Sequence, residues 1–327
     1  MRVLFLYRGK NEAGDNRVVV TQGKSLEAAG VEIEYFPLTG RGPGTYFRAL
    51  SAIRKRLRSS EADLIHAHYG FSGFAAWMAS GRRPVIVSFM GSDLLGSHSR
   101  GGGKTPGSWL MSQLNILLAR FCYSLSIVKS AGMQKRLLKN TPSAVIPNGV
   151  DLDIFKPVDR LEARRLLNLD RDEFIVLFPA IRNNPEKNFT LASEAAGSLE
   201  EKGFRLLEVN SAGREEMSML FNAADMLLVT SFHEGSPNVV KEAMACGCPV
   251  VSTAVGDIPW LFGDAPGHYL PGFDAREVSA AIQAAAKFRR DSRFTAGRER
   301  IMETGLDSVT IAGIIMSHYS RLTAKED

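Results

Sequence analysis

Two glutamates, Glu234 and Glu242, stand with seven residues between them in a stretch that could bind a phosphorylated sugar. Glu234 lies in a short polar loop beside Gly235, and Glu242 falls inside an apolar-faced helix. Ionised carboxylates only accept hydrogen bonds, so sugar hydroxyls are suitable partners for them. The N-terminus of a helix presents unpaired N–H groups, which suit phosphate. The two carboxylates together with the start of the helix therefore predict a site for a sugar linked to phosphate.

The elements around this pair form a strand–loop–helix–strand unit. Residues 226–229 and 249–252 are apolar runs typical of buried parallel strands. We expect Ser236 to be the N-cap of the intervening helix and Pro237 its first residue, and Gly247 ends it. In this arrangement the start of the helix lies at the carboxyl ends of the strands, where open α/β sheets bind ligands.

The stretch HEGSPNVVKEAMACGCPVVS resembles the nucleotide-sugar site of family 4 glycosyltransferases, which are retaining enzymes of the GT-B fold. The resemblance implies that Glu234 contacts the donor sugar and that Glu242 binds the ribose. It also implies that the following loop binds the diphosphate through Gly235, Ser236, Pro237, Asn238 and Val239. Taken alone, two glutamates at this spacing are also typical of a solvated surface helix.

A second motif, Arg182 and Lys187 with four residues between them, follows the apolar strand expected at residues 173–179. The pair resembles the Arg-x4-Lys that holds the donor diphosphate in the same family. Cleavage of a sugar–phosphate bond builds negative charge on the leaving diphosphate, and fixed cations stabilise that charge. We therefore expect both residues to act in catalysis. The family usually has glycine before the arginine, where this chain has Ile181.

The length of 327 residues favours two domains, and 45% hydrophobic residues are enough for two cores. No apolar run reaches the eighteen residues of a membrane span, and the first residues predict a strand and not a secretory signal. Three cysteines, Cys122, Cys246 and Cys248, form no disulfide or zinc pattern. We expect a cytoplasmic protein.

The charge is unevenly divided. Residues 1–150 hold 20 Lys and Arg against 8 Asp and Glu, whereas residues 151–327 hold 20 against 27. The basic half predicts an anionic partner, either a membrane surface or a charged acceptor. No nucleic-acid-binding motif accompanies the charge. Residues 45–58 form a basic amphipathic helix, which either lies on an anionic membrane or packs as an ordinary helix with a solvated charged face.

The alternation of strands and helices predicts two Rossmann-like, doubly wound parallel-sheet domains, and the resemblance implies the GT-B fold with a central cleft. We expect an acceptor-side domain at 1–148, a nucleotide-sugar domain at 149–306, and a final helix within 307–327 that packs back on the first domain. Between Lys202 and Asp225 only one strand and one helix can be placed, so the second domain is trimmed relative to the family.

The acceptor side is predicted at the ends of two strands of the first domain. The strand at 84–89 leads into Met90, Gly91 and Asp93, where the family often has His-Gly-x-Asp. Met90 removes the imidazole, which a front-face reaction does not require. Asp93 either meets the acceptor or caps the next helix. His68, at the end of the strand at 63–68, either lines the cleft with His66 or is structural.

Two further motifs are not expected to be functional. GGGKT at 101–105 lacks the first glycine of a P-loop and the strand that should precede it. Asp151-x-Asp153 resembles the metal-binding motif of the other large glycosyltransferase fold, but it lies near the domain boundary and away from the phosphate signals. We expect neither a metal nor a cofactor, with the nucleotide sugar as co-substrate.

The sequence therefore predicts a retaining glycosyltransferase that moves a sugar from a nucleotide-diphosphate sugar to an acceptor hydroxyl. The basic first half favours a glycan or glycolipid acceptor, such as a lipid-linked intermediate of a bacterial surface polysaccharide, at the inner membrane face. Two other functions fit the same residues: a nucleotide-sugar epimerase of the same fold, and a nucleotide-sugar-binding protein without catalysis. The sugar, the base and the oligomeric state are not determined by these motifs.

Overall fold

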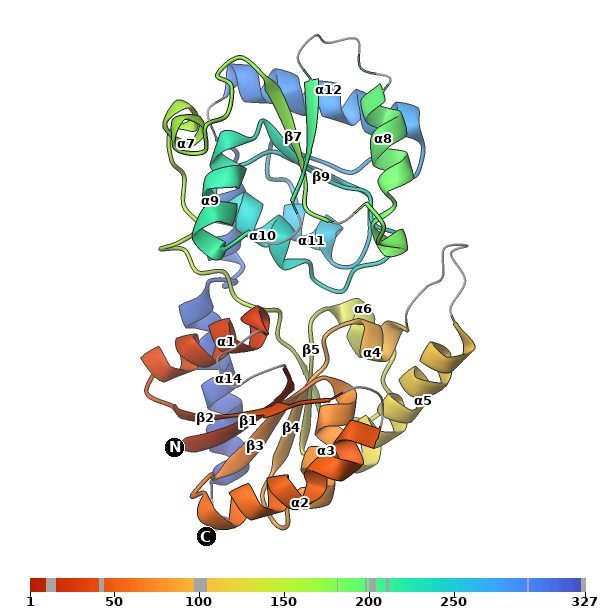
Figure 1. Ribbon diagram of the computed structural model, residues 1–327, viewed down its shortest axis with the longest axis vertical. Coiled ribbons are helices and arrows are strands. Elements are labelled where there is room, and N and C mark those ends of the chain that lie inside the picture. The colour runs from red at the N-terminus through yellow and green to blue at the C-terminus, as the bar shows by residue number, and fades with distance from the viewer. Residues whose placement is uncertain are drawn as a thin grey trace. The chain divides into compact units, whose positions relative to one another are not determined.

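The computed structural model describes residues 1–9, 16–40, 44–96, 105–180, 182–197, 199, 204–209, 212–292 and 294–324. They fold into two compact units. The first contains the described residues up to Gly149 and those from Ser308 on, and the second runs from Val150 to Asp307. Each unit is an α/β structure (Figure 1), which confirms the predicted fold class.

The first unit is built on a parallel sheet of six strands in the order β2-β1-β3-β4-β5-β6. Its central strands are buried because helices cover both of their faces, and the apolar residues 3–7 of β1 have no exposed surface. The strands are β1 Arg2–Arg8, β2 Glu32–Leu38, β3 Leu64–His68, β4 Val85–Ser88, β5 Leu125–Val128 and β6 Ser143–Val145.

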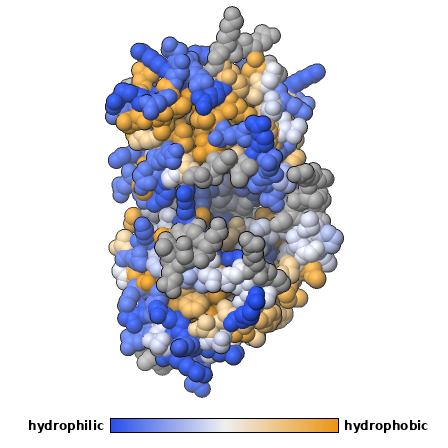
Figure 2. Space-filling view, in the orientation of Figure 1, coloured by the Kyte–Doolittle hydropathy of each residue, from blue (hydrophilic) through white to orange (hydrophobic). Residues whose placement is uncertain are grey.

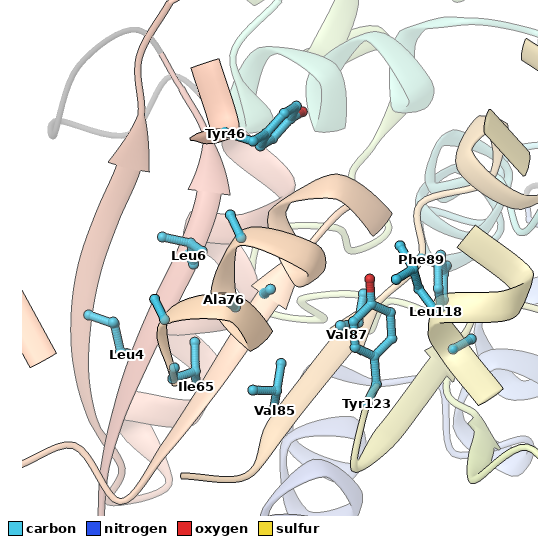
Figure 3. Close-up of a cluster of buried hydrophobic side chains, with 14 of the residues drawn as sticks. Leu4, Leu6, Tyr46, Ile65, Ala76, Val85, Val87, Phe89, Leu118 and Tyr123 are labelled. Carbon is cyan, nitrogen blue, oxygen red and sulfur yellow. The ribbon is translucent and has the colours of Figure 1, made fainter. Parts of the chain in front are cut away.

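One face of this sheet is covered by a layer of three helices, α2, α3 and α5. Their inner side chains share a single core cluster with inward-facing residues of β1, β3 and β4, as Figure 3 shows for Leu6, Ile65 and Ala76. The C-terminal helix α14 packs beside α1 in the same unit. The helices are α1 Arg17–Ala28, α2 Gly44–Ser59, α3 Gly70–Ala79, α4 Ser92–Leu95, α5 Pro106–Phe121, α6 Ala131–Gln134 and α14 Ser308–Thr323.

The second unit has a parallel sheet of five strands in the order β11-β10-β9-β7-β8. Its strands are β7 Phe174–Phe178, β8 Phe204–Glu208, β9 Met226–Val229, β10 Val250–Ser252 and β11 His268–Tyr269. Its helices are α7 Arg160–Leu166, η1 Pro185–Lys187, α8 Phe189–Gly197, α9 Arg214–Ala223, α10 Asn238–Ala245, α11 Ile258–Phe262, α12 Ala275–Asp291 and α13 Gly297–Glu303.

The one strand and one helix predicted between Lys202 and Asp225 are present among the residues that the structure describes. Between Lys202 and Asp225 these residues form only β8 and α9, and β8 is an edge strand. A cavity of about 420 Å³ lies along this edge. The lining includes Leu207, Leu220 and Glu208 but none of the residues predicted to bind donor or acceptor.

Some local predictions were wrong. The sequence pattern favours a helix at 134–139, but α6 spans Ala131–Gln134, because the Ser130 hydroxyl accepts a hydrogen bond from the Met133 amide and starts the helix earlier. The pattern also favours a helix from residue 293, whereas α13 begins at Gly297. The short elements α7, α8 and β11 were not predicted, since each has too few residues for its periodicity to be recognised.

The basic helix α2 behaves as a packed helix. Tyr46, Ile53 and Leu57 are buried in the core of the first unit, so this side of the helix is covered by protein, whereas Phe47 is exposed. Among the helices that the structure describes, none has the length and hydropathy required to cross a bilayer.

Candidate donor and acceptor sites

The residues predicted to bind the donor lie in the second unit, at the carboxyl ends of adjacent strands. β9 pairs with both β7 and β10 in parallel register, so the segments that follow β7 and β9 emerge at the same edge of the sheet. The segment after β7 carries Arg182 and Lys187. The segment after β9 carries Glu234 and leads into α10, which carries Glu242.

Lys187 and Glu234 are brought into direct contact. The Lys187 ammonium lies 2.5 Å from Glu234 Oε1, and the glutamate side chain is 14% exposed. Backbone contacts hold their two loops together: the Thr230 hydroxyl donates to the Lys187 carbonyl at 2.9 Å, and the Phe232 amide donates to the Glu186 carbonyl at 2.9 Å. The cation and the carboxylate are therefore positioned by fixed backbone and not by their side chains alone.

Arg182 has a different partner. Its guanidinium binds the carboxylate of Glu208 at the end of β8 and lies 4.7 Å above the ring of Phe189. The side chain is 63% exposed, so it is accessible to solvent while it is paired. Ile181, which stands where the family usually has glycine, lies outside the described residues.

The start of α10 differs from the prediction. The helix begins at Asn238 and its N-cap residue is Pro237, so the expectation that Ser236 caps it was wrong. The reason is the backbone of Pro237, which is extended and displaces Ser236 one residue away from the cap position. As a result the N-cap residue of α10 provides no side-chain cap, and the positive end of the helix dipole favours an anionic group there.

Glu242 lies one turn inside α10 and is partly buried. Its carboxylate forms no hydrogen bond with any residue that the structure describes. Burial raises its pKa, and the charges of Lys241 and Arg214 oppose that shift. A buried carboxylate that lacks a donor can accept a hydrogen bond from a ligand hydroxyl at little extra desolvation.

Three residues beneath this loop were missed by the sequence reasoning. Gly256 has a φ of +62°, and a Cβ atom there would lie 2.8 Å from the carbonyl oxygens of Glu234 and Gly235. Next to it, burial raises the pKa of Asp257 to about 6, and the Ser236 hydroxyl and the Lys241 ammonium oppose the shift. Lys241 is fully buried, which lowers its pKa to about 8. The available signal was the glycine in the segment that follows β10, since glycine is favoured where the backbone has a positive φ and approaches another loop closely.

In the first unit, the predicted acceptor-side residues Met90, Gly91 and Asp93 are close together because Asp93 organises their backbone. Its carboxylate accepts hydrogen bonds from the amides of Met90, Gly91 and Gly70 at 2.9 to 3.1 Å, and the residue is 3% exposed. Asp93 therefore binds backbone amides from a position inside α4, whose N-cap residue is Gly91, so it is not the helix cap that was one of its two predicted roles.

His68 is also buried. Its ring stacks on His66 with 4.4 Å between centroids, and burial together with the charges of His66 and Lys129 holds its pKa well below the usual value. His66 shares hydrogen bonds with Tyr319 and Ser88, and burial lowers its pKa to about 3. Both rings are therefore neutral parts of the core at the carboxyl ends of the strands.

The remaining candidates have structural partners. Asp151 accepts hydrogen bonds from the Asp153 and Ile154 amides and pairs with Arg214 at 3.2 Å. Cys246 and Cys248 are buried thiols whose pKa is raised to about 12 by desolvation, which suits packing and not redox chemistry. The part of the chain that the structure describes holds no group of three His, Cys, Asp or Glu side chains arranged for a metal ion.

Comparison with known families decides the identity. The sequence profile of the domain described as Glycosyltransferase Family 4 matches residues 3–154, and that of Glycosyl transferases group 1 matches residues 170–287. The chain belongs to the family 4 glycosyltransferases. It is therefore a transferase enzyme, and the residues around Glu234 and Lys187 lie within the group 1 match.

Relatives of this glycosyltransferase agree with that assignment. A D-inositol 3-phosphate glycosyltransferase of Mycobacterium marinum is 26% identical over 343 residues, covering 84% of this chain and 73% of the relative. Among solved structures, sucrose-phosphate synthase from Thermosynechococcus elongatus has a TM-score of 0.81 at 21% identity, covering 98% and 99% of the two chains. Anabaena Alr3699/HepE in complex with UDP-glucose has a TM-score of 0.72 at 19% identity, covering 98% and 100%. These likenesses establish the GT-B fold.

Proposed function

We propose that this glycosyltransferase moves a sugar from a nucleotide-diphosphate sugar to an acceptor hydroxyl with retention of the anomeric configuration. The observation that carries the proposal is the contact between Lys187 and Glu234 beside the first turn of α10. It provides a cation, a carboxylate and a helix N-terminus at one edge of the sheet. These three groups match a diphosphate joined to a sugar.

In the proposed reaction the bond between the sugar C1 and the diphosphate oxygen breaks, and the acceptor oxygen bonds to C1 on the same face. The proton of the acceptor hydroxyl passes to the departing phosphate oxygen. Lys187 and Arg182 stabilise the charge that develops on the diphosphate, as do the amides of residues 235–239. Glu234 accepts hydrogen bonds from the sugar hydroxyls, and Glu242 accepts them from the ribose. We propose that these groups suffice without a divalent metal or another cofactor.

The pairing of Arg182 with Glu208 is compatible with this role. The guanidinium is exposed, and the pair lies at the surface, where an ion pair contributes little free energy. A diphosphate can therefore compete with Glu208 for the guanidinium or share it. The UDP-glucose complex of the structurally similar Anabaena protein supports a nucleotide-diphosphate sugar as the donor.

For the acceptor we propose a lipid-linked or surface-glycan intermediate at the inner face of the cytoplasmic membrane, bound to the first unit. The support is the charge of residues 1–150, where Lys and Arg outnumber Asp and Glu by 20 to 8. Such a surface attracts anionic acceptors and the phosphates that link glycans to lipid carriers.

The test is the release of nucleotide diphosphate from a panel of nucleotide sugars, with and without a membrane lipid extract. We expect release that depends on the extract, that persists in EDTA, and that yields a product with the donor's anomeric configuration by NMR. Glu242→Ala should raise KM for the donor, whereas Glu194→Ala, an exposed glutamate of α8, should not. An altered sugar still attached to its nucleotide would identify an epimerase, and nucleotide binding without release would contradict catalysis.

A further inference from the structure

The helix α5 exposes a continuous apolar stripe. Leu110, Leu114, Leu117 and Phe121 follow one another at intervals of four, three and four residues, so they lie on one face of the helix. Their exposed fractions range from 42% to 72%, and Trp109 beside them is 52% exposed. In Figure 2, apolar residues gather at the lower right of the view, on the α5 side of the first unit.

The opposite side of α5 faces the protein and carries polar groups. Ser112 and Asn115 are buried, and they donate hydrogen bonds to the carbonyl oxygens of Leu94 and Asp93 respectively. Ile116 and Leu118 supply its contact with the core cluster. A surface helix of a globular protein normally turns its largest apolar side chains to the core and its polar ones to water. α5 places five large apolar side chains on the outside, which indicates a partner there.

The apolar surface continues onto the neighbouring helices. α3 lies directly against α5, since a Cβ atom on Gly70 would be 2.4 Å from the Asn115 amide oxygen. The rings of Phe47 on α2, Phe74 and Trp77 follow one another at centroid distances of 6.1 and 6.2 Å, and Phe47 and Trp77 are exposed. The layer α2-α3-α5 therefore presents aromatic and aliphatic side chains on the outer side of the first unit.

Basic residues predominate in the part of the chain that forms this layer. Residues 35–150 contain fifteen Lys and Arg but only three acidic residues. Each of the three is engaged elsewhere: Glu61 pairs with the Arg2 side chain, Asp63 accepts from the Arg2 amide, and Asp93 binds buried backbone amides. None of α2, α3 and α5 contains an acidic residue, and Arg120 of α5 lies 5.3 Å from the ring of Phe121.

We propose that the outer face of α5, together with Phe47 and Trp77, docks on an anionic phospholipid bilayer. A helix with Trp, Leu and Phe on one side and basic residues around it binds the boundary between headgroups and acyl chains, where its apolar side chains enter the bilayer and its cations meet lipid phosphates. A second copy of the chain fits less well, because a two-fold contact would place the same basic surface against itself.

The sequence left open whether the basic helix at 45–58 lies on a membrane, and this inference assigns the docking mainly to α5. Only the purpose of the docking, which is to bring a lipid-linked acceptor to the first unit, rests on the proposed function. The docking itself requires neither donor nor turnover, so the two proposals are tested separately.

The experiment is co-sedimentation of the full chain with phosphatidylcholine vesicles that contain or lack about one third phosphatidylglycerol. We expect binding to the anionic vesicles that weakens as salt rises, with a blue shift of the Trp109 emission in a Trp77→Phe/Trp260→Phe variant. The double variant Leu114→Ser/Leu117→Ser should weaken binding by roughly tenfold or more, because it removes two apolar anchors. Val309→Ser, a 78% exposed residue of α14, is the matched control and should bind normally.

Several results would overturn the proposal. Failure to sediment with anionic vesicles, or equal loss of binding in the Val309→Ser control, would contradict docking through α5. A dimer in solution that Leu114→Ser/Leu117→Ser converts to monomer would assign the stripe to a second copy. Nucleotide binding, measured by calorimetry with UDP and GDP, should be the same in all variants, so a failed vesicle experiment leaves the donor site to be judged by its own assay.

Discussion

Lys187 Nζ lies 2.5 Å from Glu234 Oε1, although the two residues are 47 positions apart and follow different strands. β7 and β9 are hydrogen-bonded neighbours in the sheet, so the loops that follow them meet at its carboxyl edge. The ion pair fixes the carboxylate beside the start of α10 before any ligand arrives. Because the Glu234 carboxylate is already oriented in the free enzyme, no binding energy of the ligand is needed to orient it.

The first prediction concerns this pair. Lys187→Ala removes the cation expected to face the leaving diphosphate, and Glu234→Gln removes the charge of the sugar-binding group. Each substitution should lower kcat about 10²- to 10³-fold, the range seen when one charge-stabilising group is removed from an active site. Steady-state release of nucleotide diphosphate measures the effect.

Arg205→Ala provides the control for the ion pair, because it breaks the exposed Arg205–Glu173 pair in the same sheet. Its activity should stay near that of the unmodified chain. The double variant Lys187→Ala/Glu234→Gln should lose less than the product of the single losses, since the two side chains act as one unit. Single variants that keep most of their kcat would show that the pair is structural only.

The second prediction concerns Gly256, whose φ of +62° and close contact with the Glu234 and Gly235 carbonyls leave no room for a side chain. Gly256→Ala must either shift the Glu234 loop or accept a strained backbone, which costs roughly 1–3 kcal/mol. We expect a lower Tm together with a lower kcat. Gly30→Ala has a similar positive φ but nothing within 4 Å, so it should lower Tm without changing kcat. Equal effects of both variants on kcat would contradict the loop contact.

The two segments of the candidate donor site could be predicted from the sequence because each follows a strongly apolar strand. The segments around Glu234 and Lys187 each follow a buried strand, and parallel strands bring such segments to one edge. The contact between the two side chains could not be predicted, since it depends on β7 and β9 being neighbours. The order of the strands in the sheet could not be derived from the sequence motifs.

Other features depended on contacts between distant residues. From the sequence alone, Asp93 could contact the acceptor or cap a helix. Its role became clear only from the structure, in which three backbone amides donate to its carboxylate. The apolar residues of α2 and α5 have the same helical periodicity, which does not reveal which face is buried. The buried hydrogen bonds of Ser112 and Asn115 reverse the usual orientation of α5, and their acceptors lie on a different segment, at Leu94 and Asp93.

The third prediction concerns Lys241 and Asp257, which lie beneath the donor loop. Burial lowers the pKa of Lys241 to about 8, and the negative charges of Asp257 and Glu242 oppose that shift. Asp257→Asn removes a negative charge that compensates the buried ammonium of Lys241. We expect it to lower the free energy of unfolding in urea at pH 7 by about 0.5–3 kcal/mol, the usual range for a destabilising substitution. Lys241→Met/Asp257→Asn should recover most of the loss, and an Asp257→Asn variant as stable as the unmodified chain would contradict the compensation of the two charges.

The fourth prediction concerns His268, whose two ring nitrogens meet no hydrogen-bond partner among the described residues and whose ring stacks on Phe262. Burial lowers its pKa to about 4. In the unfolded chain a histidine has a pKa of about 6.5, so between these values the unfolded state binds a proton that the folded state excludes. Its neutral ring therefore makes the folded state less stable as pH falls from 6.5 toward 4, by at most about 3 kcal/mol.

His268→Phe keeps the stacked ring and removes this titration. We expect it to be more stable than the unmodified chain at pH 7 by about 1 kcal/mol, because two unpaired nitrogens are lost from the interior. The gain should be larger at pH 5, where the histidine of the unmodified chain favours unfolding. Urea unfolding followed by Trp260 fluorescence in a Trp77→Phe/Trp109→Phe background reports on the second unit. The exposed His233→Gln should show no such pH-dependent gain, and an equal gain for His268→Phe at both pH values would mean that His268 is not the titrating group.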